Sequence, residues 1–291
     1  MLFLLLSAFC STLLVIIFKL FQRWRVNIWQ GVTFNYLTCV VTGSLLAKTS
    51  FSSINLNWLH LSTALGMLFF TGFSLSAFSV RWAGVAITTL AAKMSLIVPV
   101  LFNLLFVPGT RLSPMVYAGV GLTFPALWLA TAKPQTPVVQ PDKKALAPIL
   151  LPAAVFLASG IVDTLINYSN STLTDPEQQT MFSIASFGTA ALTGFLVLFL
   201  RGSILKEQLT WKGIVGGLLL GIPNYFSVYL LLQALSAFEN NGAWVFPFYN
   251  IVIILAASTA SVTLFKEKLT PTNRIGLLLA GVAMILLAVA R

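Results

Sequence analysis

Two stretches of this sequence repeat one pattern: residues 111–119 read Arg-Leu-Ser-Pro-Met-Val-Tyr-Ala-Gly, and residues 268–276 read Lys-Leu-Thr-Pro-Thr-Asn-Arg-Ile-Gly. They lie 157 positions apart, and the same offset aligns residues 57–132 with residues 214–289 without a gap. The alignment places identical residues opposite each other, such as Leu75 with Leu232. Internal duplication of an apolar chain is typical of transporter folds.

The composition indicates a membrane protein. The chain is 58% hydrophobic and 8% charged, with a mean hydropathy of +0.92, whereas a soluble domain has about 25% charged residues. A membrane helix needs about 20 apolar residues to cross a hydrocarbon core of roughly 30 Å. We therefore expect an all-α protein with ten transmembrane helices, near 2–21, 28–47, 58–80, 84–107, 113–132, 147–169, 179–200, 211–235, 241–265 and 272–290.

The ten segments divide into two halves of five. Residues 1–132 form the first repeat, the Pro-rich stretch 133–146 is a semi-rigid linker, and residues 147–291 form the second repeat. The first two segments of each half align more weakly, for example Thr42-Gly43 with Thr193-Gly194 at an offset of 151. Because five is an odd number, the second repeat enters the membrane inverted. This arrangement predicts a pseudo-two-fold axis in the membrane plane, a central cavity and alternating access.

The net charge of +10 predicts an orientation and not a nucleic-acid partner. Of the 17 Lys and Arg residues, 13 lie in the connections that follow the first, third, fifth, seventh and ninth segments, and three lie on the other side. Cytoplasmic loops of membrane proteins collect positive charge. In a bacterial cytoplasmic membrane, this bias places the linker inside and both termini outside.

The ends of the fourth and ninth segments carry a family resemblance. Each is followed by a turn of the form basic-Leu-hydroxyl-Pro, and the ninth ends in Leu264-Phe265-Lys266-Glu267-Lys268-Leu269-Thr270. With ten spans in two repeats, the chain resembles the drug/metabolite transporter superfamily of EamA type, whose usual ending is Leu-Gly-Glu-Arg-Leu-Thr. Phe-Lys replaces Leu-Gly here. The resemblance implies a ten-helix transporter whose termini are usually cytoplasmic, opposite to the orientation that the charges favour.

Lys93 is the first candidate for a substrate contact. It lies in the middle of the predicted span 84–107, where a charged side chain is costly and normally faces a cavity or a partner. At the offset of 157 its counterpart is Asn250, which also lies in mid-span. Thr89 and Asn103 share a helical face with Lys93. The alternative is that Lys93 only forms a buried ion pair or caps a broken helix.

Asp163 is the one acidic residue inside a predicted span. Ser159, Asp163, Asn167 and Asn170 form a polar stripe along one helical face. Asp163 could carry a coupling proton, or it could neutralise Lys93 without taking part in transport. If both charges face one cavity, the site suits a zwitterion, with Lys93 for its carboxylate and Asp163 for its ammonium.

Three further candidates are amide and aromatic residues. Asn224 and Tyr225 follow Pro223, which frees a backbone carbonyl inside the predicted helix. Tyr225 and Tyr249 could contribute to an aromatic pocket. Structural alternatives are a proline kink for the first pair and an interfacial belt position for the tyrosines.

The sequence contains no motif for an enzyme. It has no phosphate-binding Gly-rich loop, no Gly-x-Ser-x-Gly, no metal-ligand spacing and a single histidine. We therefore expect no cofactor and no metal, and a transporter driven by a gradient, such as a proton gradient, acting on a small polar or zwitterionic, amino-acid-like metabolite, with export as the expected direction. A lipid or lipid-linked-sugar flippase and a non-transporting accessory subunit remain alternatives. Because one chain holds both repeats, a monomer could form the cavity.

Overall fold

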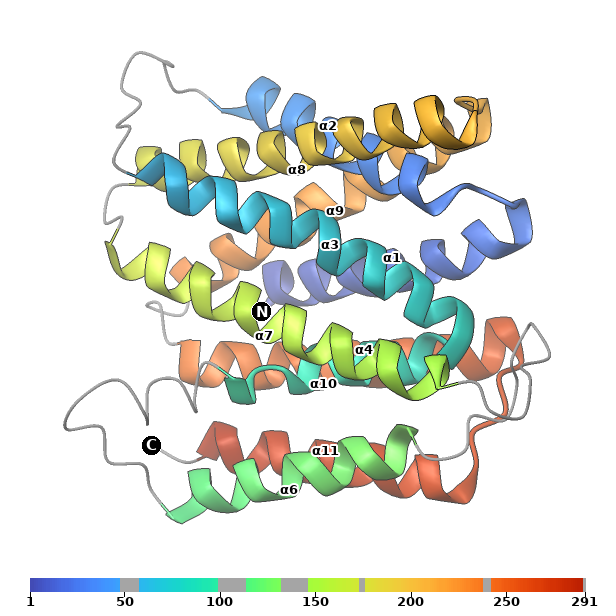
Figure 1. Ribbon diagram of the computed structural model, residues 1–291. Coiled ribbons are helices and arrows are strands. Elements are labelled where there is room, and N and C mark those ends of the chain that lie inside the picture. The colour runs from blue at the N-terminus through green and yellow to red at the C-terminus, as the bar shows by residue number, and fades with distance from the viewer. Residues whose placement is uncertain (48–57, 99–113, 132–145, 173–175, 238–241, 290–291) are drawn as a thin grey trace.

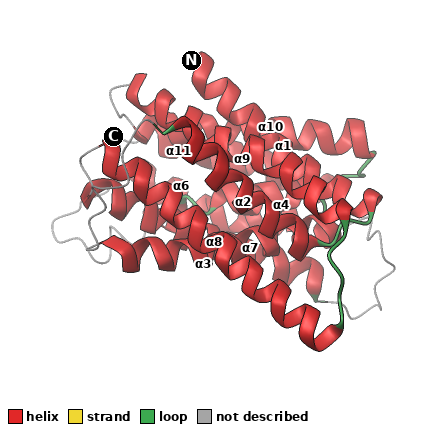
Figure 2. Ribbon diagram, turned by 90° about the horizontal axis from the view of Figure 1, so that it is seen from above, coloured by secondary structure: helices red, strands yellow, loops and turns green. Residues whose placement is uncertain are grey.

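The computed structural model describes residues 1–47, 58–98, 114–131, 146–172, 176–237 and 242–289. Every regular element in these residues is a helix, as Figure 2 shows. The ten helices are α1 (Leu2–Trp24), α2 (Ile28–Leu46), α3 (Leu59–Ala83), α4 (Val85–Met94), α6 (Pro114–Thr131), α7 (Ala147–Thr172), α8 (Pro176–Leu205), α9 (Trp211–Ala237), α10 (Gly242–Phe265) and α11 (Pro271–Val289).

The helices have the length and composition of membrane spans. Five of them, α1, α3, α7, α8 and α9, contain segments long and apolar enough to cross a membrane, and α4, α10 and α11 contain shorter apolar segments. Large apolar side chains such as Leu45 and Trp211 are 80% and 74% exposed. Surfaces of this kind suit lipid and not water. The prediction of an all-helical, multi-pass membrane protein is confirmed at this level.

The helices run side by side, so that their connections gather at two ends of the bundle (Figure 1). The turns α1–α2, α3–α4, α8–α9 and α10–α11 lie together at one end, on the right of Figure 1, which we call the turn end. Three of these turns begin with a basic residue in the left-handed conformation, Arg25, Lys206 and Lys266. Positive charge at the carboxyl end of a helix is favourable because it faces the negative end of the helix dipole.

The start of α11 explains the hydroxyl-Pro motif. Thr270 precedes the helix, and its Oγ1 accepts a hydrogen bond of 3.0 Å from the Asn273 N–H. Pro271 occupies the first helical position, where its missing N–H costs no hydrogen bond. The repeated motif at Ser113-Pro114 likewise ends where α6 begins with Pro114. The motif is thus a helix start signal.

Helices of one half pack mainly on helices of the other. α1 and α2 pack on α9, and α7 and α8 pack on α3. The remaining contacts include α2 with α8, α1 with α10, α4 with α7, α4 with α10, and α6 with α11. The linker 133–146 therefore does not separate two independently packed domains among the described residues.

A row of glycines allows a close approach between α9 and α2. Gly213, Gly217 and Gly221 recur at every fourth position along α9. A Cβ atom at Gly217 would lie 2.3 Å from the Cβ of Phe34 and 2.9 Å from the backbone nitrogen of Asn35. Small residues at this spacing are a common means of bringing membrane helices together.

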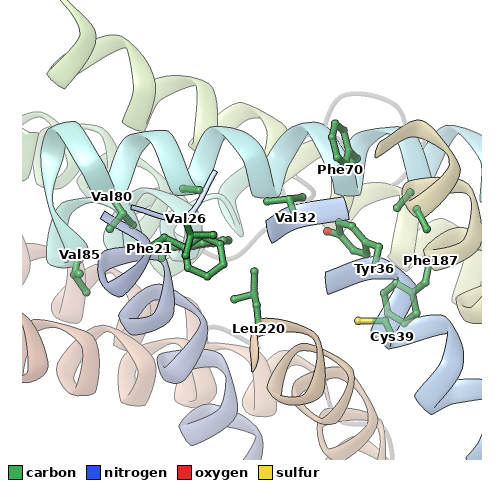
Figure 3. Close-up of a cluster of buried hydrophobic side chains, with 14 of the residues drawn as sticks. Phe21, Val26, Val32, Tyr36, Cys39, Phe70, Val80, Val85, Phe187 and Leu220 are labelled. Atoms are coloured by element: carbon green, nitrogen blue, oxygen red, sulfur yellow. The ribbon is translucent and has the colours of Figure 1, made fainter. Parts of the chain in front are cut away.

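The largest buried cluster lies between α1, α2, α3, α8 and α9 (Figure 3). Aromatic rings fill much of it: Tyr36 stacks on Phe69 with centroids 6.2 Å apart, and Phe18 meets Phe21 edge to face at 5.9 Å. The Tyr36 hydroxyl donates to the Phe69 carbonyl. This cluster fixes the relative positions of helices from both halves.

Candidate functional site

Lys93 lies in the last turn of α4, directly before a break in the helix. α4 ends at Met94, well before the end of the predicted span 84–107. The Ser95 hydroxyl donates to the Ala92 carbonyl at 2.6 Å, and the Val98 N–H donates to the Ser95 carbonyl at 2.8 Å. Pro99 follows in the sequence, and a proline ring clashes with the carbonyl four residues earlier. The predicted span 84–107 is therefore interrupted by a turn at residues 95–96.

The Lys93 ammonium lies over the ring of Tyr249, 5.2 Å from its centroid. Lys93 is partly buried, whereas Tyr249 is 5% exposed. The tyrosine ring attracts the cation through its negative face. The partial negative charge at the end of α4 adds to this attraction. Lys93 thus has an aromatic ring as a contact, and its assignment to a substrate site stays a prediction.

The hydroxyl of Tyr249 connects α10 to α1. Ser11 Oγ is hydrogen-bonded to it, and Ser7 Oγ lies 3.4 Å from it. Ser7 Oγ also donates to the Ser227 carbonyl of α9 at 2.6 Å. Side chains from α1 and α4 thus meet around Tyr249 of α10, and Ser7 extends the contact to the backbone of α9.

Asp163 brings a carboxylate from α7 to the same region. Its Oδ2 accepts a hydrogen bond of 3.2 Å from Ser95 Oγ, at the break of α4. Within the described residues, however, the ion pairs with N···O distances of at most 4.0 Å are Lys19–Glu267 and Arg201–Glu207, not Lys93–Asp163. We call Ser7, Ser11, Lys93, Asp163 and Tyr249 the central polar site.

Asn224 forms a second buried polar contact nearer to α2. Its Nδ2 donates to Asn35 Oδ1 at 3.2 Å, and the Asn224 side chain is 4% exposed. Asn35 Nδ2 is buried and has no hydrogen-bond partner in the described part of the chain. Cys39 Sγ donates to the carbonyl of Gly221, two residues before Pro223. Cys39 thus contacts the α9 backbone at this point, whereas the carbonyl that Pro223 would free lies four residues before the proline.

Tyr225 lies apart from Lys93. It stacks on Tyr229, with centroids 6.1 Å apart, and lines a pocket between α8 and α9. The lining residues of this pocket are Thr180, Ser183, Ile184, Phe187, Tyr225, Val228 and Tyr229. The structure thus separates Tyr225 and Tyr249, which the sequence analysis placed in one aromatic pocket.

The other predicted residues have different outcomes. Thr89 is 2% exposed, and its hydroxyl has no partner among the described residues. Asn250 is 7% exposed and follows Tyr249 in α10. Asn103 lies outside the described residues. Asn167 belongs to α7, but its side chain is outside the description.

Sequence reasoning missed Ser7, Ser11 and Asn35. Ser7 and Ser11 are four residues apart in an apolar helix, so they share one face. That spacing was a usable signal, although single serines are common in membrane helices. Asn35 lies in the predicted span 28–47, and its uncharged amide gave no comparable warning.

The turn end contains a second polar group that is not part of the central polar site. Arg201 pairs with Glu207, and Asn27 Nδ2 donates to Glu207 Oε2 at 3.3 Å. The hydrogen bond from Arg201 lowers the pKa of the Glu207 carboxyl. Arg201 also lies over the Trp29 ring, 5.4 Å from its centroid. This group ties the α1–α2 turn to the α8–α9 turn.

Comparison with known proteins shows the fold but no activity. No family model matches the chain. A protein of Haemophilus influenzae (strain ATCC 51907 / DSM 11121 / KW20 / Rd), described as an uncharacterized protein, is 27% identical over 277 residues, which are 92% of this chain and 91% of that protein. A solved structure, described as "Crystal structure of protein", is 17% identical to this chain and has a TM-score of 0.58 against it. The match covers 96% of this chain and 97% of the other chain. The chain is therefore similar over nearly its whole length to a fold that has been solved.

Proposed function

We propose that this protein is a secondary-active transporter of a small polar or zwitterionic, amino-acid-like metabolite. The direction that we propose is export. The observation that carries the proposal is the central polar site, where Lys93 and Asp163 face one region without an ion pair between them. Ionisable residues at membrane depth normally serve a substrate, a coupling ion or a relay. We place the protein in the drug/metabolite transporter superfamily, EamA type.

The proposal includes two inverted five-helix repeats around a pseudo-two-fold axis. In the two repeats, α1, α2 and α3 are the counterparts of α7, α8 and α9. The packing is symmetric under exchange of these counterparts: α1 packs on α9 as α7 packs on α3, and α2 packs on α9 as α8 packs on α3. Counterpart helices also meet, as α2 meets α8 and α4 meets α10. An axis between the halves explains both the symmetric pairs of contacts and the contacts between counterpart helices.

Two glycine contacts support the same axis at the level of single residues. A Cβ on Gly43 would lie 3.2 Å from Ile184 of α8, and a Cβ on Gly194 would lie 2.4 Å from Thr33 of α2. The offset of 151 that aligns Gly43 with Gly194 also aligns Thr33 with Ile184. The two contacts are thus equivalent under exchange of the halves.

The chemistry of the central polar site favours a zwitterion. The Lys93 ammonium has a neutral ring as its contact and can bind a substrate carboxylate, while Asp163 has a hydroxyl donor and can bind an ammonium. In a low-dielectric site, an ammonium and a carboxylate that lack their full complement of partners are costly. A bound zwitterion would supply an anion for Lys93 and a cation for Asp163. Without substrate, a proton on Asp163 would neutralise the carboxylate.

The proposed setting is a bacterial cytoplasmic membrane crossed ten times. The basic turn end would face the cytoplasm, so that both termini lie outside. A gradient would drive the cycle, with Asp163 as the candidate proton carrier. The second candidate function is flipping of a lipid or lipid-linked sugar. It is favoured by the largely apolar pocket between α8 and α9, where Tyr229 is 42% exposed.

The test is thermal unfolding of the purified protein against a panel of amino acids and related metabolites. A ligand that binds the native state raises the melting temperature. We expect at least one zwitterion to stabilise the wild type, and Lys93→Met and Asp163→Asn to lose that shift. A shift that persists in both variants would contradict the assignment of the site. Stabilisation by lipids alone would favour the flippase.

A further inference from the structure

The carboxylate of Glu267 joins three parts of the chain at the turn end. Its Oε1 lies 2.8 Å from Lys19 Nζ near the end of α1. Its Oε2 accepts hydrogen bonds of 2.6 Å from Ser261 Oγ in α10 and of 3.1 Å from the Val85 N–H, the first residue of α4. The side chains of Lys19 and Glu267 are each 13% exposed. This set is called the Glu267 contact below.

The Glu267 contact fixes the start of the helix that carries Lys93. Gly84 alone forms the turn between α3 and α4, with φ at +89°, a conformation that favours glycine. A Cβ atom at Gly84 would lie 2.8 Å from Glu267 Oε2. The carboxylate also faces the positive end of the α4 dipole. Lys93 lies eight residues further along this helix, roughly 12 Å from its start.

A second set of contacts closes the same end of the bundle. Gln30 of α2 is 2% exposed, and its Nε2 donates to the Gln208 carbonyl at 2.8 Å. Its Oε1 accepts from the backbone N–H and the hydroxyl of Thr210, at 3.0 and 2.7 Å. Asn27 also donates to Glu207, which is paired with Arg201. These bonds hold the α1–α2 turn against the α8–α9 turn. The turn end is therefore held closed by bonds between the two halves.

Between the Glu267 contact and the central polar site lie two buried hydroxyls. Thr89 of α4 and Ser258 of α10 each have a buried oxygen without a hydrogen-bond partner in the described ranges. The two helices pack on each other. A buried hydroxyl without a partner is destabilising, and water or substrate would satisfy it. These groups are where separation of α4 from α10 would open a polar route.

We propose that Glu267 is the gate residue of this protein: its contact with Lys19 and the start of α4 holds the turn end closed, and its release frees α4 to move and opens a route to Lys93. The inference rests on the proposed transport function, because a gate has meaning only for a route. The structure is then the state closed at the turn end. Glu267 does not touch the substrate; it positions the helix that does.

The test measures access of a thiol reagent to a buried reporter. In a background with Cys10→Ala and Cys39→Ala, Thr89→Cys places one thiol between the gate and Lys93. A cationic, membrane-impermeant methanethiosulfonate is applied to vesicles of each orientation. Lys268→Cys, in a separate protein, marks the side that the turn end faces, because Lys268 is exposed. The assay requires no substrate.

We expect slow labelling of Thr89→Cys in the parent and about tenfold faster labelling from the turn side with Glu267→Gln, because a hydrogen-bonded charge is lost. Lys19→Met removes only the ion pair, so its effect should be smaller. The exchange Lys19→Glu with Glu267→Lys restores a pair of charges, yet lysine cannot accept the Val85 N–H. The exchanged protein should therefore remain open. Lys268→Met and Glu207→Gln, in which Gln30 still holds the turns, are the matched controls.

A second reporter separates a gate from general loosening. Ser183 lines the pocket between α8 and α9. It lies seven residues after the start of α8, and the opposite end of this helix leads into the turn end (Figure 1). In alternating access, Glu267→Gln should slow labelling of Ser183→Cys from the opposite side. Unchanged labelling of Thr89→Cys, faster labelling of both reporters, or an equal effect of Glu207→Gln would overturn the inference.

The gate and the transport proposal fail in different ways. Reciprocal changes at the two reporters would support the gate whether or not a metabolite is found in the thermal panel. A metabolite shift that depends on Lys93, together with reporters that ignore Glu267, would support transport and overturn the gate.

Discussion

The turn end and the central polar site both bring a lysine and a carboxylate together, but they use them differently. At the turn end, Glu267 binds Lys19 at 2.8 Å and accepts two further hydrogen bonds. At the centre, Lys93 lies over the Tyr249 ring and Asp163 accepts from Ser95, with no ion pair at contact distance. The first set of charges is satisfied by the protein, whereas the second retains binding capacity. The difference distinguishes charges that the protein itself pairs from charges that it leaves without an ionic partner, and it is the second kind to which we assign substrate binding.

The α2–α9 contact joins the two halves of the chain outside both regions, and overpacking it should have the largest effect on stability. Gly217→Ala would place a Cβ atom 2.3 Å from Phe34, and overpacking of this kind costs about 1–3 kcal/mol. We expect a clear fall in melting temperature in detergent. Gly281→Ala is the control, because no atom lies within 4 Å of its Cβ position. In a helix that substitution should be neutral or stabilising by about 0.5–1 kcal/mol.

Equal melting temperatures for Gly217→Ala and Gly281→Ala would contradict the close α2–α9 approach. If Gly217→Ala also opened the turn end to the thiol reagent, the two regions would be coupled through α9 as well as through α4.

Tyr249→Phe should have an intermediate effect that is confined to the centre. The variant keeps the ring beneath Lys93 but loses the hydroxyl bonded to Ser11 and close to Ser7. A hydrogen bond contributes about 1 kcal/mol, so we expect roughly five- to tenfold weaker binding of any zwitterion found in the thermal panel. Tyr225→Phe is the matched control, because Tyr225 lines the separate pocket between α8 and α9. Isothermal titration of both variants measures the difference.

A larger loss of binding in Tyr225→Phe than in Tyr249→Phe would move the binding site to the pocket between α8 and α9. It would also strengthen the flippase as the candidate function.

Lys266→Gly should have the smallest effect, at the turn end. Lys266 has φ at 53°, and the left-handed conformation costs a non-glycine residue about 1 kcal/mol. Glycine removes this cost while Glu267 keeps its direction, so we expect a small rise in melting temperature and unchanged protection of Thr89→Cys. Lys268→Gly is the control, because Lys268 is not among the residues with positive φ. A large fall in stability would show that the Lys266 side chain contributes more than its backbone conformation.

The turn at Lys266 also belongs to the motif on which the family resemblance rests. Glycine is the usual residue of the resembling family at this position, and the structure gives the reason: the chain leaves α10 with a positive φ. Lysine at this position should cost more than glycine, because the left-handed conformation disfavours a side chain. The motif residue Glu267 was visible in the sequence as part of a helix ending, but its partners were not, because Lys19 is far away along the chain.

The candidate site divides in the same way. Lys93 and Asp163 could be predicted because a charge in an apolar segment is rare and costly. Their spacing could not, since it depends on how α4, α7 and α10 pack. Tyr225 and Tyr249 looked alike in sequence, yet only Tyr249 lies beneath Lys93. Ser7 and Ser11 became part of the site through a hydroxyl on another helix.

The sequence by itself determined that the chain is helical and apolar, where its helices start, and which residues carry charge within them. Those properties depend on length, hydropathy and caps, which are local. Only the tertiary structure decided that Glu267 pairs with Lys19, that Lys93 and Asp163 form no ion pair with each other, and that α9 approaches α2 through glycines. The physical reason is that burial, hydrogen bonding and electrostatics are properties of pairs of groups, and the chain brings those pairs together only when it packs.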